Sequence, residues 1–312
     1  MEAEARGPVL LAYDGSDAAG HAIASAGPLL EPRTAQVAYA FTPLARSLFG
    51  RRLRGLRPEL LADAEGELEE AEAREARELC ETGVRLAEQA GLSAQPLLLH
   101  QEEESVWQAV TKAAGERQAE ATVIGAHGHR GLAQRLLGSS SQDLVEHSRV
   151  PVLAVPAEAA ERASGPALLC YDDSADAQGA IEAAGGLLAD KRALVLSLWQ
   201  SWTAFVPRGG GMAGAPAENL DDLARGEAAA AASGGSRLAQ QAGFEPDAVS
   251  ARAGASLWQT ILDTADEQDA SVIVMGQRGL SGLSALLGSV SHGVVQHATR
   301  PVLIVPSKGG AP

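Results

Sequence analysis

The sequence predicts an α/β protein built from two tandem, doubly wound parallel sheets of five strands each. Short apolar runs without polar alternation, typical of buried parallel strands, alternate with longer segments of helical pattern. Residues 138–156 recur as residues 288–306, with 10 identities in 19 positions at an offset of 150 residues. A chain of 312 residues is long enough for about two domains, so each copy has the length to build its own core.

The first copy contains five predicted strands separated by helices. A buried strand over residues 8–13 ends at Asp14-Gly15, which favours a turn, and the polar residues there cap the next helix. Segment 59–90 is rich in Glu, Ala and Arg, which favours a long helix, and Gly91 ends it. The other predicted elements are strands at 35–41, 94–99, 122–124 and 150–155, and helices at 18–30, 105–117 and after residue 139.

The second copy repeats this order. Its predicted strands are 166–171, 193–199, 246–251, a strand beginning at 272, and 301–305, and its helices include one ending near 189, 220–242 and 256–268. A loop with three consecutive glycines is expected over residues 200–216. These elements predict a first domain at residues 1–156, a linker at 157–165 and a second domain at 166–312.

Each copy carries a glycine-rich loop after its fourth strand, followed by serines that begin a helix. Glycines let the backbone approach a ligand closely, and a helix N-terminus presents N–H groups that favour anions. In a doubly wound sheet, ligands bind beyond the carboxyl ends of the strands, where the strand order reverses. The pattern therefore predicts a phosphate-binding site, with an irregular strand-to-helix turn as the alternative.

Each copy has an aspartate after its first strand, and after its fourth strand a glycine loop, a Gly-Ser-x-Ser helix start and a closing Pro-Val-Leu-x-Val-Pro strand. In this combination the chain resembles the universal stress protein family in its tandem, nucleotide-binding form. The first copy matches that subgroup's Gly-x2-Gly-x9-Gly-Ser/Thr pattern at Gly125, Gly128, Gly138 and Ser139. The resemblance covers nearly the whole chain. It implies a flavodoxin-like, adenine nucleotide alpha hydrolase-like fold and a regulatory module of the stress response that binds ATP or a related adenine nucleotide. Mg²⁺ is left open as a companion of the phosphates.

The resemblance also implies roles for individual positions. Asp14 is expected against the base and ribose, Ala40 to offer its backbone to adenine, and the glycine loop to surround the ribose and phosphates. The implied nucleotide-binding residues of the first copy are Asp14, Gly15, Ala40, Gly125, Gly128, Gly138, Ser139, Ser140 and Ser141. Those of the second copy are Asp172, Leu198, Gly276, Gly279, Gly288, Ser289, Val290 and Ser291.

The second copy departs from the family pattern in two ways. Eight residues, rather than nine, separate Gly279 from Gly288. Asp173 replaces Gly15, which is expected to add a negative charge near the ribose or phosphates. Whether both copies bind nucleotide stays open at this point.

Composition excludes several classes of partner. A net charge of −15 argues against nucleic acid, which requires a basic face. No apolar run approaches the roughly 18 residues of a membrane span. Cys80 in a predicted helix and Cys170 in a predicted strand match no metal spacing, so both are expected to be small buried residues of a cytoplasmic protein.

Pairing between the two copies is also expected, because the family's domains commonly pair through their last strands. Strands 150–155 and 301–305 are apolar and predicted to lie at sheet edges, so we expect an intrachain pseudo-dimer. A further homodimer stays open.

No residue set predicts a dedicated enzyme. Ser139 has no paired base within reach in the sequence, so slow ATP hydrolysis is the remaining enzymatic alternative. The non-enzymatic alternative is a dimerising scaffold that binds no nucleotide.

His127 and His129 form a His-x-His pair without a third ligand, so no metal site is expected. The arginines of residues 46–57 suit either a lid over phosphates or a solvated surface. Trp107 and Trp258 are interpreted as residues that pack in the core from a helix. His147 and His297 are expected near the C-termini of their helices, where a protonated imidazole suits the helix dipole.

Overall fold

The computed structural model describes residues 7–30, 33–41, 58–100, 104–126, 139–159, 165–201, 215–254, 256–279 and 287–307, with side chains from residue 67 in α3 and from residue 219 in α7. The first half comprises β1 (Val9–Ala12), α1 (Asp17–Leu29), β2 (Thr34–Phe41), α3 (Pro58–Gln89), β3 (Ser93–His100), α4 (Val106–Glu116), β4 (Ala121–Gly125), α5 (Ser139–His147) and β5 (Val152–Val155). The second half comprises β6 (Ala167–Cys170), α6 (Ala175–Leu187), β7 (Arg192–Trp199), α7 (Ala215–Gln241), β8 (Glu245–Arg252), α8 (Leu257–Glu267), β9 (Val272–Gly276), α9 (Ser289–His297) and β10 (Val302–Val305).

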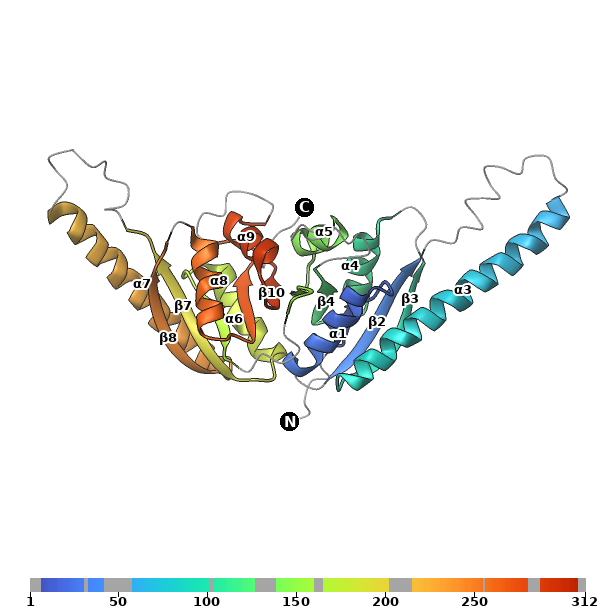
Figure 1. Cartoon of the computed structure of the whole chain (residues 1–312), viewed down its shortest axis with the longest axis horizontal. Coiled ribbons are helices and arrows are strands. Elements are labelled where there is room, and N and C mark those ends of the chain that lie inside the picture. Colours follow the sequence, from blue (N-terminus) through green and yellow to red (C-terminus); the bar gives the residue numbers. More distant parts are fainter. Residues whose placement is uncertain are drawn as a thin grey trace.

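The strands of the described residues form one continuous sheet of 10 strands in the order β3-β2-β1-β4-β5-β10-β9-β6-β7-β8. Each half is parallel, and β5 and β10 meet antiparallel at the centre, with Leu303 opposite Leu153. Pairing through the last strands is therefore confirmed. The expectation of two separate five-stranded sheets is not, because that same pairing leaves neither last strand at an edge (Figure 1).

Within each half the strand order reverses next to the first strand. β1 pairs with β2 on one side and with β4 on the other, so that Val9 lies beside both Ala35 and Ala121. β6 has the same place between β7 and β9 in the second half. The carboxyl ends of β1 and β4, and of β6 and β9, therefore meet at the two switch points where ligands of doubly wound sheets bind.

Helices cover both faces of the sheet. α1, α3, α6 and α7 pack on one face, and α4, α5, α8 and α9 on the other. Successive strand residues alternate between these layers, as Leu10 and Leu11 do, which explains why the central strands are apolar throughout. Each of the two cores runs through both halves, so the halves share their hydrophobic interior.

The halves also contact each other at the C-terminal ends of α1 and α6. Leu30 and Leu188 form an antiparallel bridge, and Ala189 N donates to Leu29 O over 2.9 Å. Arg33, whose side chain is 2 % exposed, pairs with Glu120 and donates to backbone carbonyls at the end of α6.

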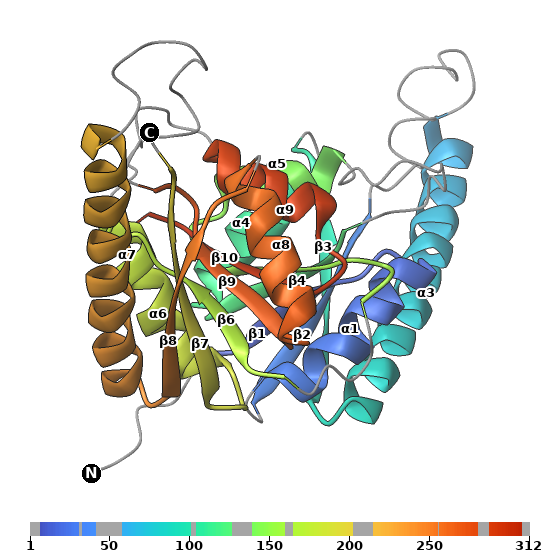
Figure 2. The same cartoon turned by 60° about the vertical axis from the view of Figure 1, so that its left-hand side comes forward.

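The long helices α3 and α7 lie at the two outer flanks of the molecule in both views (Figures 1 and 2). The start of α7 at Ala215 is five residues earlier than the sequence predicted. No helix of the described segments has the length and apolarity needed to cross a membrane. Cys80 is buried in α3, as predicted, whereas Cys170 lies in the predicted strand, β6, but is only partly buried.

Candidate functional site

A pocket lies at the switch point of each half. The pocket of the first half has a volume of about 150 Å³ and that of the second about 310 Å³. Each is bounded by the ends of the first, second and fourth strands of its half. Helices also line each pocket, α4 and α5 in the first half and α8 and α9 in the second. The strand-end aspartate and the serine-rich helix start, whose residues the resemblance implies in nucleotide binding, therefore lie together in both halves.

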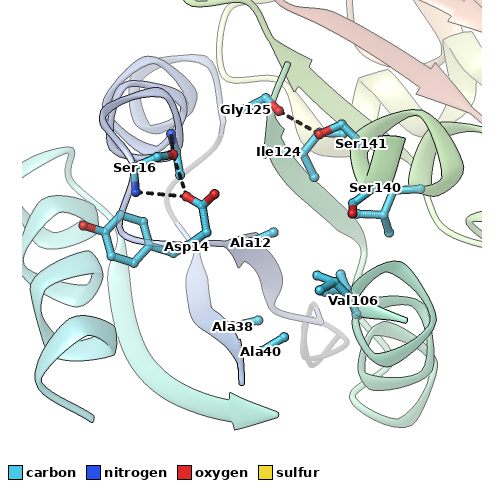
Figure 3. Close-up of a pocket in the computed structure, with 14 residues that line it drawn as sticks. Ala12, Asp14, Ser16, Ala38, Ala40, Val106, Ile124, Gly125, Ser140 and Ser141 are labelled. Carbon is cyan, nitrogen blue, oxygen red and sulfur yellow. Dashed lines mark hydrogen bonds between the residues drawn. The ribbon is translucent and has the colours of Figure 1, made fainter. Parts of the chain in front are cut away.

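The first pocket has an apolar side and a polar side (Figure 3). Small side chains of the strands, Ala38 and Ala40, face Val106 of α4 across it. Asp14 at the end of β1 and Ser140 at the start of α5 supply the polar side. An apolar slot beside a helix N-terminus suits a ligand with a flat apolar ring at one end and an anion at the other.

The second pocket contains every residue predicted for that half. Asp172, Leu198, Gly276, Gly279, Gly288, Ser289, Val290 and Ser291 all line it. In the first pocket Asp14, Ala40, Gly125, Ser140 and Ser141 are lining residues, whereas Gly15 and Ser139 are not. Gly128 and Gly138 lie outside the described residues.

The two strand-end aspartates are held in the same orientation. Asp14 Oδ1 accepts hydrogen bonds from Ser16 N over 2.9 Å and from Ser16 Oγ over 2.5 Å. Asp172 Oδ1 accepts from Ser174 N over 3.1 Å. These serines are also the N-caps of α1 and α6. The turn that begins each helix therefore also fixes a carboxylate at the rim of the pocket.

The last serine of each Gly-Ser-x-Ser motif serves the fold. Ser141 Oγ donates to Gly125 O and Ser291 Oγ donates to Gly276 O, each over 3.0 Å. Each hydroxyl therefore ties its helix start to the end of the neighbouring strand, while the nucleotide-binding role that the resemblance implies for Ser141 and Ser291 stays a prediction. Backbone N–H groups of the first turn remain the natural donors for an anion.

The start of α9 leaves such donors available. Its N-cap is Gly288, which has no side chain with which to cap the first turn, unlike the serine N-caps of α1 and α6. The first bond within the helix is from His292 N to Gly288 O, over 2.8 Å. The N–H groups of residues 289–291 therefore precede the hydrogen-bonded ladder at the wall of the second pocket.

The glycines that end β4 and β9 are required by packing. A Cβ on Gly125 would lie 2.9 Å from Ala18 O, and a Cβ on Gly276 would lie 2.8 Å from the Cβ and carbonyl carbon of Asp176. The first turns of α1 and α6 press against these strand ends. At these two positions glycine is needed for the contact between strand and helix, in addition to any contact of its backbone with a ligand.

Gly276→Ala is expected to lower the free energy of unfolding by about 2 kcal/mol, because the new methyl group must displace the backbone of α6. The matched control is Gly186→Ala near the end of the same helix, where a Cβ meets nothing within 4 Å and helix propensity improves. Urea denaturation of both variants measures the difference. Equal stability of the two would contradict the packing role.

Asp173 replaces a glycine where the backbone is left-handed. Gly15 has φ 81° and Asp173 has φ 63°, a conformation that aspartate tolerates better than most residues. Tyr171 Oη donates to Asp173 Oδ1 over 2.9 Å, and burial together with this bond raises the pKa of Tyr171 to about 12. Asp173 does not line the second pocket. The charge expected near the ligand is instead turned toward Tyr171.

Sequence reasoning missed the walls contributed by α4 and α8. Val106 and Val110 line the first pocket, and Leu257 and Ile261 line the second. Their helical spacing could have identified them, since these helices follow the third strand of each half. Two further lining residues, Cys170 and Arg278, carried no pattern that separated them from their neighbours.

Both Trp–His pairs that the sequence treated separately are stacked. Trp107 lies 4.9 Å from His147 and Trp258 lies 4.6 Å from His297, measured between ring centroids. His147 and His297 end α5 and α9, as predicted. The stacking joins α4 to α5 and α8 to α9, which supports the packing interpretation of the tryptophans.

Among the described residues no group of three or more His, Cys, Asp or Glu side chains is arranged to hold a metal ion. His127, His129 and the arginines of residues 46–57 lie outside the described residues.

Comparisons with known proteins agree with this architecture. The model of the universal stress protein family matches residues 6–156 and again residues 165–306. The curated universal stress protein YxiE of Bacillus subtilis is 59 % identical over 46 residues, which is 14 % of this chain and 31 % of that protein's length.

Solved structures show the same fold across both halves. The crystal structure of a universal stress protein from Archaeoglobus fulgidus aligns with a TM-score of 0.57 at 18 % identity, over 96 % of this chain and 98 % of its own. A functionally unknown protein from Pseudomonas aeruginosa aligns with a TM-score of 0.52 at 15 % identity, over 97 % of this chain and 93 % of its own. At these identities the likeness concerns the fold alone.

Proposed function

The chain belongs to the universal stress protein family, with two tandem copies of its domain, and on this premise we propose that it binds ATP or a related adenine nucleotide at its two switch-point pockets. Binding, rather than dedicated catalysis, is the proposed activity. Occupancy of the pockets would then act as the regulatory signal of a stress-response module in the cytoplasm.

The observation that carries this proposal is the composition of the second pocket. Its eight predicted residues converge from three strands, the loop and the start of α9. Leu196 and Leu198 form an apolar wall suited to adenine, while the N–H groups of residues 289–291 and the guanidinium of Arg278 suit phosphates.

The glycine loop closely approaches the strand-end carboxylate in the same pocket. A Cβ on Gly279 would lie 2.6 Å from Asp172 Oδ2, so any larger residue would fill the gap between the loop and the strand-end carboxylate. An accompanying Mg²⁺ would be held chiefly by the phosphates, because Mg²⁺ commonly binds proteins through one or two carboxylates and the substrate's own oxygens.

Cys170 provides a direct test in the second pocket, which it lines. Burial, reinforced by the charge of Asp172, raises the pKa of this thiol to about 12, so alkylation by iodoacetamide is expected to be slow at pH 8 and to accelerate as the pH rises and thiolate forms. ATP at ten times its Kd is expected to slow the labelling of Cys170 about tenfold, followed by peptide mass spectrometry.

Cys80 is the internal control for this experiment. It is fully buried in α3, where its thiol donates to Val37 O over 3.1 Å, and it lies on the other face of the sheet. Equal protection of both cysteines would indicate global stabilisation instead of a ligand in the pocket. Unchanged labelling of Cys170 at saturating ATP would contradict binding in the second half.

The first half can be read in the same way, because Ala12 has the place of Cys170 in the first pocket. Ala12→Cys combined with Cys170→Ala moves the thiol from the second pocket to the first. Protection of the introduced thiol by ATP is expected. Failure of ATP to protect in either half would favour the nucleotide-independent scaffold, which the β5–β10 junction supports on structural grounds.

A further inference from the structure

Gln277 belongs to the glycine loop of the second half, but its side chain reaches the first half. Its backbone N–H donates to Val305 O over 2.8 Å, and its carbonyl accepts from Gly288 N over 3.0 Å. Its side-chain Nε2 donates to Glu146 O over 2.7 Å and to Val145 O over 3.3 Å. The residue is 4 % exposed, so these bonds are made away from water.

The carbonyls that Gln277 contacts lie in the last turn of α5. Carbonyls of a last helical turn have no partner inside the helix, so the Gln277 amide caps α5 from across the junction of the two halves. The opposite end of α5 carries Ser140 and Ser141, which line the first pocket. α5 and α9 lie beside each other at the centre of the molecule in both views (Figures 1 and 2).

Among the described residues, the first half has no counterpart of this contact. Ala126 occupies the equivalent position and makes the equivalent backbone bond, from its N–H to Val155 O over 2.8 Å. Its methyl side chain has no donor to offer α9. Within the part of the chain that the structure describes, this side-chain contact therefore runs from the loop of the second half to the helix of the first.

We infer that Gln277 couples the two pockets, so that a nucleotide in the second half tightens binding in the first. The inference rests on the proposed function. Gln277 is flanked by Gly276 and Arg278, which line the second pocket, so a ligand there contacts the residues on both sides of Gln277 and holds its amide against α5. An α5 held in this way presents its N-terminal N–H groups to the first pocket before the nucleotide arrives.

Two substitutions remove the contact while keeping the loop. Gln277→Met preserves the length and volume of the side chain but has no N–H donor, and Gln277→Ala reproduces the residue found at Ala126. Leu198→Trp fills the second pocket from β7, away from the loop, and so prevents binding there. All these chains also carry Ala12→Cys and Cys170→Ala, so the labelled pocket thiol belongs to the first pocket. The ATP concentration that halves its labelling measures the affinity of that pocket separately.

With Gln277 present, Leu198→Trp is expected to weaken ATP binding in the first pocket about fivefold. In either Gln277 variant the same blocking substitution is expected to change that affinity less than twofold. Circular dichroism and urea denaturation establish that each protein is folded, and the two independent variants guard against a failure of one of them.

Each remaining outcome counts against the inference. Equal weakening with and without Gln277 overturns the coupling while leaving the proposed function standing. The same holds for no weakening in the chain that keeps Gln277, which is the result expected if the two pockets bind ATP independently. A chain in which ATP protects neither thiol overturns the proposed function and the coupling together.

Discussion

Arg33→Ala is expected to lower the free energy of unfolding by about 3 kcal/mol, because it breaks a buried ion pair and uncaps a helix of the other half. The guanidinium, 2 % exposed, pairs with Glu120 and donates from Nη2 to Gly186 O over 2.7 Å and to Leu187 O over 3.4 Å. We place the loss at the low end of values for buried pairs because the Glu120 side chain is 31 % exposed and keeps a bond from Gly7 N.

Lys191 gives a matched comparison, since it follows α6 as Arg33 follows α1. Its Nζ donates to Gly185 O over 2.9 Å and to Leu188 O over 2.6 Å, all within the second half. Lys191→Ala is expected to cost about 1 kcal/mol. Chemical denaturation with two spectroscopic probes measures both. A loss for Arg33→Ala no greater than that for Lys191→Ala would show that the contact between the halves contributes little.

Gly279→Glu is expected to weaken ATP binding in the second pocket at least 100-fold, or by roughly 2.7 kcal/mol. The first side-chain carbon would already lie 2.6 Å from Asp172 Oδ2, so the longer side chain must either displace that carboxylate or extend into the pocket, and both changes disturb the site. Its carboxylate would also repel both Asp172 and the phosphates. The ATP concentration that halves labelling of Cys170 measures the effect.

Gly226→Glu is the control for this substitution. It introduces the same charge on α7, where a Cβ meets nothing within 4 Å, and is expected to leave ATP binding unchanged. Circular dichroism checks that both variants are folded. Wild-type affinity in the Gly279→Glu protein would mean that the loop does not contact the nucleotide.

Much of the fold follows from local pattern in the sequence. Unbroken apolar runs such as residues 8–13 predict strands covered on both faces, and their alternation with helices predicts a parallel, doubly wound sheet. The family resemblance, supported by the apolar character of the last strands, implied the central pairing of β5 with β10. The resemblance then implied residues of the second half that the structure brings together in one pocket.

Contacts between distant positions could not be predicted in this way. Arg33 and Gln277 each donate to backbone carbonyls of the other half. Because every residue has a backbone carbonyl, the sequence does not indicate which of them accepts such a bond. Gly125 and Gly276 matched a ligand-loop pattern although a neighbouring helix is what demands glycine there. The bonds of Ser141 and Ser291 to strand carbonyls could not be predicted either, because a hydroxyl at a helix start serves an anion or a strand carbonyl equally well.

The central claim is nucleotide binding, and the most direct test is to identify what the purified protein carries. The chain is purified without added nucleotide and denatured, and the released small molecules are separated, identified by mass spectrometry and quantified per chain. The account predicts an adenine nucleotide at close to two molecules per chain, or the same stoichiometry when the emptied protein is titrated with ATP. No released nucleotide, followed by no binding on titration, would contradict it.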